Sequence, residues 1–254
     1  MSALAPVLAA LDAAAETLPT SRATQREFLG AYRRTTAAVA AAIDAGFFED
    51  PAWVEAWDIV FARLYLDALA ADVAGDQCVP KPWRLAFDAP ASLPALRHVL
   101  LGMNAHINYD LPQALLAVIP EDDFTDRSLL ELRHRDHMRI DQVVTSRVAA
   151  EDDELATHST RTPLDRALQP LNRWSARRCL TEARRKVWHN TLELQQARLS
   201  EPESYARRLV ELERLSAARI ADLLAPGQVI IRLAVVGFGV VLPPAAGPAP
   251  LGHS

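Results

Sequence analysis

Apolar residues recur along most of the chain at the three- and four-residue spacing of amphipathic helices. Phe28, Tyr32, Val39 and Ile43, for example, are four or seven positions apart, which places them on one helical face. Gly, Pro and polar clusters interrupt the pattern and predict loops at 81–83, 88–94 and 151–163. The pattern between these interruptions predicts helices over Ala3–Leu18, Arg22–Phe47, Pro51–Gly75, Pro94–Ile119, Asp126–Ala150, Trp174–Leu199 and Glu203–Leu224.

Capping residues support several of these boundaries. Ser21, Asp50 and Ser92 each precede a helical pattern, and Thr125 or Asp126 precedes another. Side chains of these types accept hydrogen bonds from the first free N–H groups of a helix. We therefore expect helices to begin directly after them.

The succession of helices predicts an all-α fold: one domain over residues 1–242, built as a bundle of about six to eight helices. Residues 228–242 are rich in Val and Ile and are expected to form a short helix or an extended segment packed on the bundle. Residues 243–254 contain four prolines and two glycines, which predicts a disordered tail.

Composition narrows the function classes. The 254 residues carry a net charge of −5, with no basic arm, which argues against nucleic-acid and membrane partners. Cys78 and Cys179 lie far apart, so a zinc ribbon or redox motif is not expected. The chain starts without a basic, apolar leader, so a cytoplasmic location is expected. Phosphate-loop, dinucleotide-binding and nucleophile-elbow motifs are absent from the sequence.

The segment 100–111 is apolar around most of a helix, yet it carries four polar side chains. At about 100° per residue, His106 and Asp110 lie one turn apart on one side, and Asn104 and Asn108 on the opposite side. Buried polar groups destabilise a fold unless they are paired. We therefore expect this central helix to carry a buried polar site.

Two interpretations of this site stay open. His106 and Asp110 have the spacing to ligate one metal ion, or to act as a base and the group that orients it. In the alternative, Asp110 only fixes the tautomer of His106, and Asn104 and Asn108 tie neighbouring helices together.

Two further clusters of polar residues occur later in the chain. In the segment 133–141, His137 has the residue type to join a divalent metal site with His106 and Asp110, but the interleaved arginines favour a solvated, ion-paired face. On the later helix, Arg184 and Trp188 are one turn apart. This pair can hold an anionic group, or Arg184 can bond a buried carboxylate.

The segment Gly102–Pro112, with the sequence GMNAHINYDLP, resembles the signature of an actinobacterial family known only as a domain of unknown function. Similar supporting motifs occur at Gly46–Trp53, at Phe61, Ala62 and Tyr65, at Pro82–Trp83, and at Trp174–Ser175, Ala183–Arg184 and Trp188. The resemblance implies an all-α fold and a shared polar centre, and it implies no particular reaction or cofactor.

These observations predict a small-molecule enzyme with acid–base or metal-assisted chemistry, in which His106 and Asp110 are the catalytic or metal-ligating groups. The alternative is a non-catalytic small-molecule or protein-interaction module that holds an anionic ligand. The residues expected to bind the ligand are Asn104, Asn108, Asp136, Arg184 and Trp188.

Overall fold

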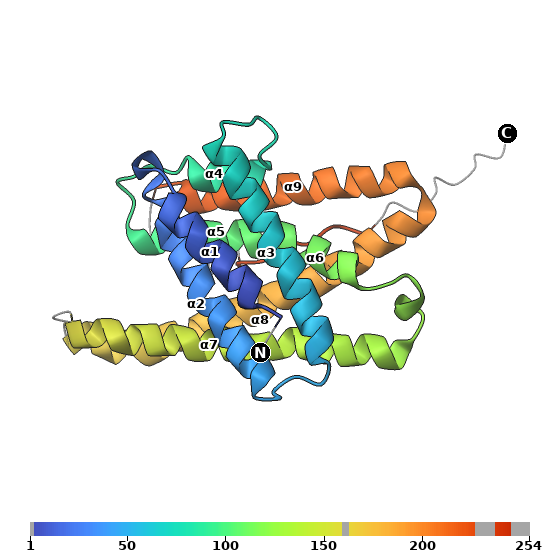
Figure 1. Cartoon of the computed structure of the whole chain (residues 1–254), viewed down its shortest axis with the longest axis horizontal. Coiled ribbons are helices and arrows are strands. Elements are labelled where there is room, and N and C mark those ends of the chain that lie inside the picture. Colours follow the sequence, from blue (N-terminus) through green and yellow to red (C-terminus); the bar gives the residue numbers. More distant parts are fainter. Residues whose placement is uncertain (1–2, 159–162, 227–236, 245–254) are drawn as a thin grey trace.

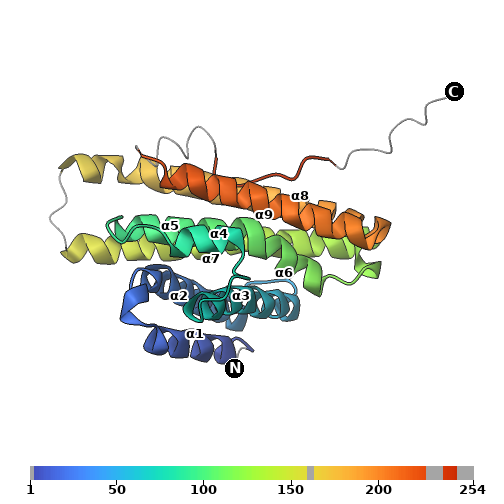
Figure 2. The same cartoon turned by 90° about the horizontal axis from the view of Figure 1, so that it is seen from above.

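The structure is a computed structural model that describes residues 3–158, 163–226 and 237–244, with the backbone alone for residues 147–177 and 202. Its helices lie in three layers (Figure 2). The first layer contains α2 (Gln25–Asp44) and α3 (Pro51–Val73), and α1 (Ala5–Thr17) packs on its outer side. The middle layer contains α4 (Lys81–Phe87), α5 (Ala95–Ala105), α6 (Leu111–Val118) and α7 (Arg127–His158). The third contains α8 (Pro163–Ser200) and α9 (Pro202–Leu224), so the described ranges contain no strand and the all-α prediction is confirmed.

The centre of the bundle is the rod formed by α5 and α6 (Figure 1), which packs against α2, α3, α8 and α9. The two helices are joined by one π-helical turn, His106–Asp110. Pro112 has no N–H to donate to the carbonyl four residues earlier, so a regular α-helix cannot continue through it unchanged. The π-turn takes up this irregularity, and its closing N–H, that of Leu111, bonds the His106 carbonyl.

Helix capping agrees with the prediction at some boundaries only. The Asp50 side chain accepts a hydrogen bond from the Trp53 N–H at 3.1 Å, and Pro51 begins α3. Ser21 instead lies within a 3₁₀ turn, and α2 begins at Gln25. That capping prediction was wrong because backbone carbonyls of the turn already accept the first N–H groups of α2.

Ser92 likewise caps no helix, because α5 follows Pro94 without a side-chain cap. Asp126 accepts hydrogen bonds from the backbone N–H groups of Ser128 and Leu129, so the prediction of a cap near Thr125 is confirmed at Asp126.

Two segments expected to be loops are helical. Lys81–Phe87 forms α4, in which the Trp83 and Phe87 rings, one turn apart, stack at 5.1 Å between centroids. The pattern was too short to be recognised as a helix. Of the expected loop 151–163, residues 151–158 belong to α7 and Pro163 begins α8, whereas residues 159–162 lie outside the described residues.

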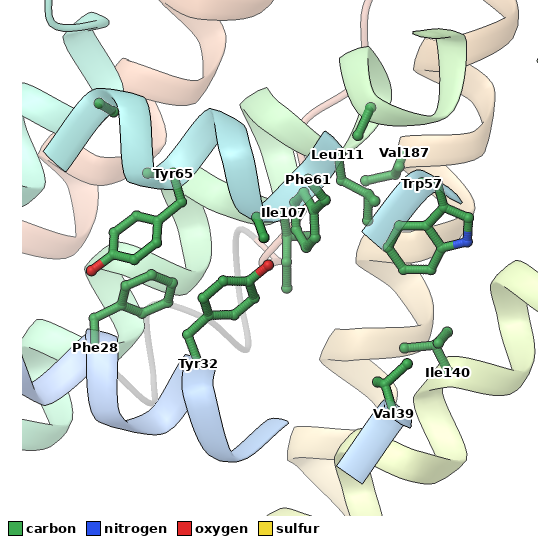
Figure 3. Packing of buried hydrophobic residues seen from close by; sticks show 14 of the residues in the cluster. Phe28, Tyr32, Val39, Trp57, Phe61, Tyr65, Ile107, Leu111, Ile140 and Val187 are labelled. Atoms are coloured by element: carbon green, nitrogen blue, oxygen red, sulfur yellow. The ribbon is translucent and has the colours of Figure 1, made fainter. Parts of the chain in front are cut away.

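Aromatic side chains dominate the core between the first two layers. Figure 3 shows Phe28 and Tyr32 of α2 beside Phe61 and Tyr65 of α3, with Ile107 of the π-turn close by. Trp57, Tyr65 and Trp83 are at most 1% exposed. Within the described residues, no helix is long and apolar enough to cross a membrane.

Residues 237–243, called the strap below, are neither helical nor part of a sheet, with a positive φ of 76° at Gly237 and a bend at Phe238, and they lie against α5, the π-turn and α8. Of the expected segment 228–242, residues 228–236 lie outside the described residues, as does the expected disordered tail from residue 245 onward. The described part of the segment is packed on the bundle and is not helical.

Candidate functional site

His106 and Asp110, called the dyad below, lie together inside the bundle. The His106 Nδ1 and Asp110 Oδ2 atoms are 2.8 Å apart, and both residues are 2% exposed. Trp83 of α4 donates its Nε1–H to the same carboxylate oxygen at 2.8 Å. The predicted pairing of His106 with Asp110 is therefore present, and it is extended by a tryptophan from a segment expected to be a loop.

Five aromatic rings, called the cage below, enclose the His106 imidazole. Phe61 stacks on it with 3.4 Å between ring centroids and an interplanar angle of 4°. Tyr32 meets it edge-on at 4.6 Å. The remaining rings lie 5.7–5.9 Å away and belong to Phe28, Tyr65 and Trp83. Because the rings surround the imidazole and leave it almost unexposed, the dyad is sealed from bulk solvent in this conformation.

Burial determines the protonation of the dyad. It lowers the pKa of His106 well below its ordinary value, because the imidazolium loses its hydration. It raises the pKa of Asp110 well above its ordinary value, partly offset by the Trp83 hydrogen bond. Both shifts favour uncharged partners. Within the described part of the chain, His106 Nε2 has no hydrogen-bond partner.

Asn104 and Asn108 face the other side of the rod, as the helical spacing predicted, and they bind the strap. Both donate from Nδ2 to the carbonyl of Phe238, each at 3.0 Å. The Asn108 Oδ1 atom also accepts from the Val240 N–H at 3.1 Å. The two asparagines therefore hold main chain from a distant part of the sequence, and both are 0% exposed.

The other predicted ligand-binding residues have structural partners. The carboxylate of Asp136 accepts the backbone N–H groups of Glu49 and Asp50 at 3.0 and 2.7 Å, which fixes the connection between α2 and α3. Arg184 forms an ion pair with Asp141 at 2.9 Å and donates to the His137 carbonyl at 3.2 Å. The carboxylate that pairs with Arg184 thus comes from α7.

His137 and Trp188 belong to the interface between α7 and α8. The two rings are 5.6 Å apart, and the His137 Nε2 atom contacts the Arg184 carbonyl at 3.1 Å. Asp136 and His137 are 0% exposed, so the expectation of a solvated face in the segment 133–141 was wrong for them. No group of three His, Cys, Asp or Glu side chains among the described residues could hold a metal ion.

A surface pocket of about 470 Å³ lies between α4 and α9 and is called the α4–α9 pocket below. Tyr109, the neighbour of Asp110 in the π-turn, lies against it, together with Lys81 and Arg84 of α4 and Glu213 of α9. The remaining lining residues are Gln77, Cys78, Val79, Pro80 and Leu85. Neither member of the dyad lines this pocket.

Several residues were not predicted from the sequence to belong to the site, although Phe61, Tyr65 and Trp83 occur in the motifs that resemble the family. The cage residues come from three different helices, and their spacing is that of ordinary core positions. Asn190 of α8, which also binds the strap, is 0% exposed. Its signal was a polar residue within an apolar helical face, next to Val187 and Leu194, the same signal that identified Asn104 and Asn108.

The sequence profile of a family of unknown function, DUF5995, matches residues 4–226. The chain belongs to this family. The match includes the dyad, the cage and the three asparagines, whereas the strap lies beyond it. No curated protein and no solved structure matches the chain.

Proposed function

We propose that the protein is a non-catalytic binding protein for a small organic anion, and that the ligand occupies the α4–α9 pocket. Its volume of about 470 Å³ falls in the range of small-molecule sites. Lys81 and Arg84 supply two positive charges against the single negative charge of Glu213. Apolar walls at Val79, Leu85 and other residues suit an aromatic or short aliphatic carboxylate.

The observation that carries this proposal is the connection between the sealed dyad and the open pocket. Asp110 accepts the Trp83 hydrogen bond and thereby ties α4 to the π-turn. Lys81 and Arg84 lie on either side of Trp83 in α4, and Tyr109 precedes Asp110 in the π-turn. The dyad thus fixes two walls of the pocket relative to each other. This gives the buried polar groups a positioning role that requires no access to a ligand.

The anion site of this proposal differs from the face of Arg184 and Trp188. Those two side chains are 4% and 8% exposed, and Arg184 is already paired with Asp141. Lys81 and Arg84 are exposed, and Arg84 uses one guanidinium nitrogen to bind the carbonyl oxygens of Gln77 and Val79, so Lys81 is the cation on which the anion site chiefly depends. We further propose that the segment Gly102–Pro112 is a signature of the family, because it contains the dyad on one side of the rod and the asparagines that bind the strap on the other.

The test is calorimetric titration of the full chain with benzoate, hydroxybenzoate, succinate and acetate. At least one is expected to bind saturably, and Lys81→Gln to weaken it about 5- to 30-fold, as loss of one charge-assisted contact does. Arg63→Gln is the matched control, because Arg63 is an exposed cation of α3 outside the pocket. Saturable binding that Lys81→Gln leaves unchanged would place the site elsewhere, and no saturable binding would contradict the proposal.

A second candidate is an enzyme that uses the dyad for acid–base chemistry, with Asp110 orienting His106. The observation that favours it is the Nε2 atom of His106, which is buried among the cage residues and has no hydrogen-bond partner within the described residues. This function requires the cage to open. Diethyl pyrocarbonate labelling of His106 under native conditions tests it, with His189, which is half-buried, as the internal reference. Labelling of His189 alone would exclude an opening that admits substrate.

A further inference from the structure

We propose that the groove under the strap is a peptide-binding site for extended segments of the pattern apolar–Gly–apolar–any–apolar. The strap of the same chain is its resident ligand, and the strap of a second copy is the occupant that replaces it. This site is separate from the α4–α9 pocket and does not depend on the function proposed there.

Two asparagine side chains of the groove form hydrogen bonds with the main chain of the strap. Asn108 binds the Phe238 carbonyl and the Val240 N–H, at 3.0 and 3.1 Å. Asn190 repeats the same contact two residues later, binding the Val240 carbonyl and the Leu242 N–H at 3.0 and 2.8 Å. In an extended chain these four groups point to one edge. The two asparagines therefore take the place of a neighbouring β-strand.

The opposite edge of the strap is bound as well. The Gly239 carbonyl accepts from the Lys186 ammonium, and the Gly239 N–H donates to Glu182, each at 3.2 Å. Both side chains belong to α8 and form an ion pair with each other. The groove thus contacts both main-chain edges, which makes it selective for extended backbone rather than for a helix.

The side chains of the strap define the sequence pattern. Phe238, Val240 and Leu242 are 3%, 5% and 0% exposed, whereas Val241 is 42% exposed. At Gly239, a Cβ atom would lie 2.9 Å from the Ala183 Cα in the backbone of α8. The groove therefore requires apolar residues at the first, third and fifth positions, glycine at the second, and leaves the fourth free.

The strap is held in the manner of a ligand. The hydrogen bonds described for the main chain of residues 238–243 all run to side chains of other elements, and none runs to the backbone of a helix. Release of the strap therefore breaks no helical hydrogen bond. A second copy carries the identical segment, which already satisfies every requirement of the groove, so it is the occupant we assign.

The first experiment uses the full chain with Gly239→Val, which weakens its own strap, and a fluorescein-labelled peptide of residues 237–244. Anisotropy is expected to show saturable binding of this peptide. The peptide with Val241→Lys is expected to bind within about threefold of it, because this position is exposed. The peptide with Gly239→Val is expected to bind at least tenfold more weakly than the unchanged peptide. The unchanged peptide is also expected to bind at least tenfold more weakly to a chain that carries Asn108→Leu in addition to Gly239→Val.

The second experiment tests the occupant by mixing two full-length variants. One carries Gly239→Val and has an intact groove; the other carries Asn108→Leu and Asn190→Leu and has an intact strap. Light scattering after size exclusion is expected to show a 1:1 complex of the mixture, with each variant alone monomeric. Peptide binding without this complex would confirm the groove and reject the second copy in favour of another protein's segment.

Circular dichroism supplies the remaining control, and Leu242→Lys provides a second way to weaken the strap. If the peptide binds neither strap variant while both retain their helices, the proposal is overturned. If both variants lose their helices, the strap is an inseparable part of the fold, and the proposal is overturned as well.

Discussion

Replacing Gly102 with alanine is expected to destabilise the protein by about 2–4 kcal/mol, because the new methyl group would overlap the Phe28 side chain. An alanine Cβ at this position would lie 2.4 Å from Phe28 Cγ and 2.6 Å from Cδ2. Carbon atoms normally approach to about 3.5–4.0 Å. The Phe28 ring would therefore have to move by about 1 Å or more.

The surroundings of Phe28 leave little room for this movement. Its ring packs at 5.0 Å from Tyr65 and 5.5 Å from Trp83, and the residue is 6% exposed. Overpacking of a core costs about 1–3 kcal/mol, and expelling a core phenylalanine costs about 3–5 kcal/mol. The higher helix propensity of alanine returns about 1 kcal/mol. Because the ring has little room to shift, the cost of expelling it applies, and subtracting the gain in helix propensity from about 3–5 kcal/mol gives the expected 2–4 kcal/mol.

Urea unfolding followed by circular dichroism measures the change in free energy. For a chain of this length, the melting temperature should fall by roughly 5–15 °C. Gly30→Ala is the matched control, since a Cβ there meets only the end of the Arg34 side chain, at 3.2 Å. It is expected to leave stability unchanged or to raise it by up to about 1 kcal/mol.

A double-mutant cycle identifies the cause. Phe28→Ala removes Cγ and Cδ2, the ring atoms that the new methyl group would overlap, so the combined variant should be at least about 1 kcal/mol more stable than the sum of the single changes predicts. Two results would refute the reasoning: Gly102→Ala as stable as the native chain, or strict additivity with Phe28→Ala.

Three further predictions concern buried polar residues. Burial raises the pKa of Asp58 to about 7 from an ordinary 3.8, so the folded state holds a proton that the unfolded state loses, and stability falls as pH rises from about 4 to 7. In urea unfolding, the free energy of unfolding of Asp58→Asn relative to that of the native chain should therefore rise by up to about 4 kcal/mol between pH 4 and pH 8. If the two chains differ by the same amount at both pH values, this prediction is wrong. Asn108→Ala should cost about 2–3 kcal/mol and Asn104→Ala about 1 kcal/mol, because Asn108 makes two of the strap contacts and Asn104 one; the reverse order of melting temperatures would contradict the geometry. His106→Ala should lower stability by about 3–5 kcal/mol, because it leaves a cavity in the cage and Asp110 without its imidazole partner; a melting temperature at or above that of the native chain would favour the enzymatic role instead.

The arrangement of the rod could be predicted from spacing alone. The separation of His106 and Asp110 from Asn104 and Asn108 follows from helical periodicity, and it survives the π-turn because each pair is only one turn long. What each face meets could not be predicted. The cage comes from α2, α3 and α4, and the strap from the far end of the described chain, so these contacts depend on tertiary packing that no local pattern encodes.

Helix α7 shows why charge patterning misled at one place. Interleaved arginines suggested a solvated face, yet Asp136 and His137 point inward while Arg135 pairs with Glu49 near the surface. Long arginine side chains reach the surface from positions beside buried ones, so their presence does not report the burial of their neighbours. Two backbone N–H groups, those of Glu49 and Asp50, donate to Asp136 and offset the cost of burying its carboxylate. These donors are far from Asp136 in the sequence, so its burial could not be predicted from its neighbours.

The position of the strap in the chain has a consequence for biosynthesis. Translation proceeds from the N-terminus, and every helix that the strap contacts is made before it. Until residues 238–242 emerge, Asn104, Asn108 and Asn190 have no main chain to bind, and a cluster of apolar side chains that includes Leu194 lacks its cover. A nascent chain that has folded up to α9 therefore exposes apolar side chains beside unpaired amide groups. Chaperones recognise exposed apolar surface of this kind, and it promotes aggregation when synthesis stalls.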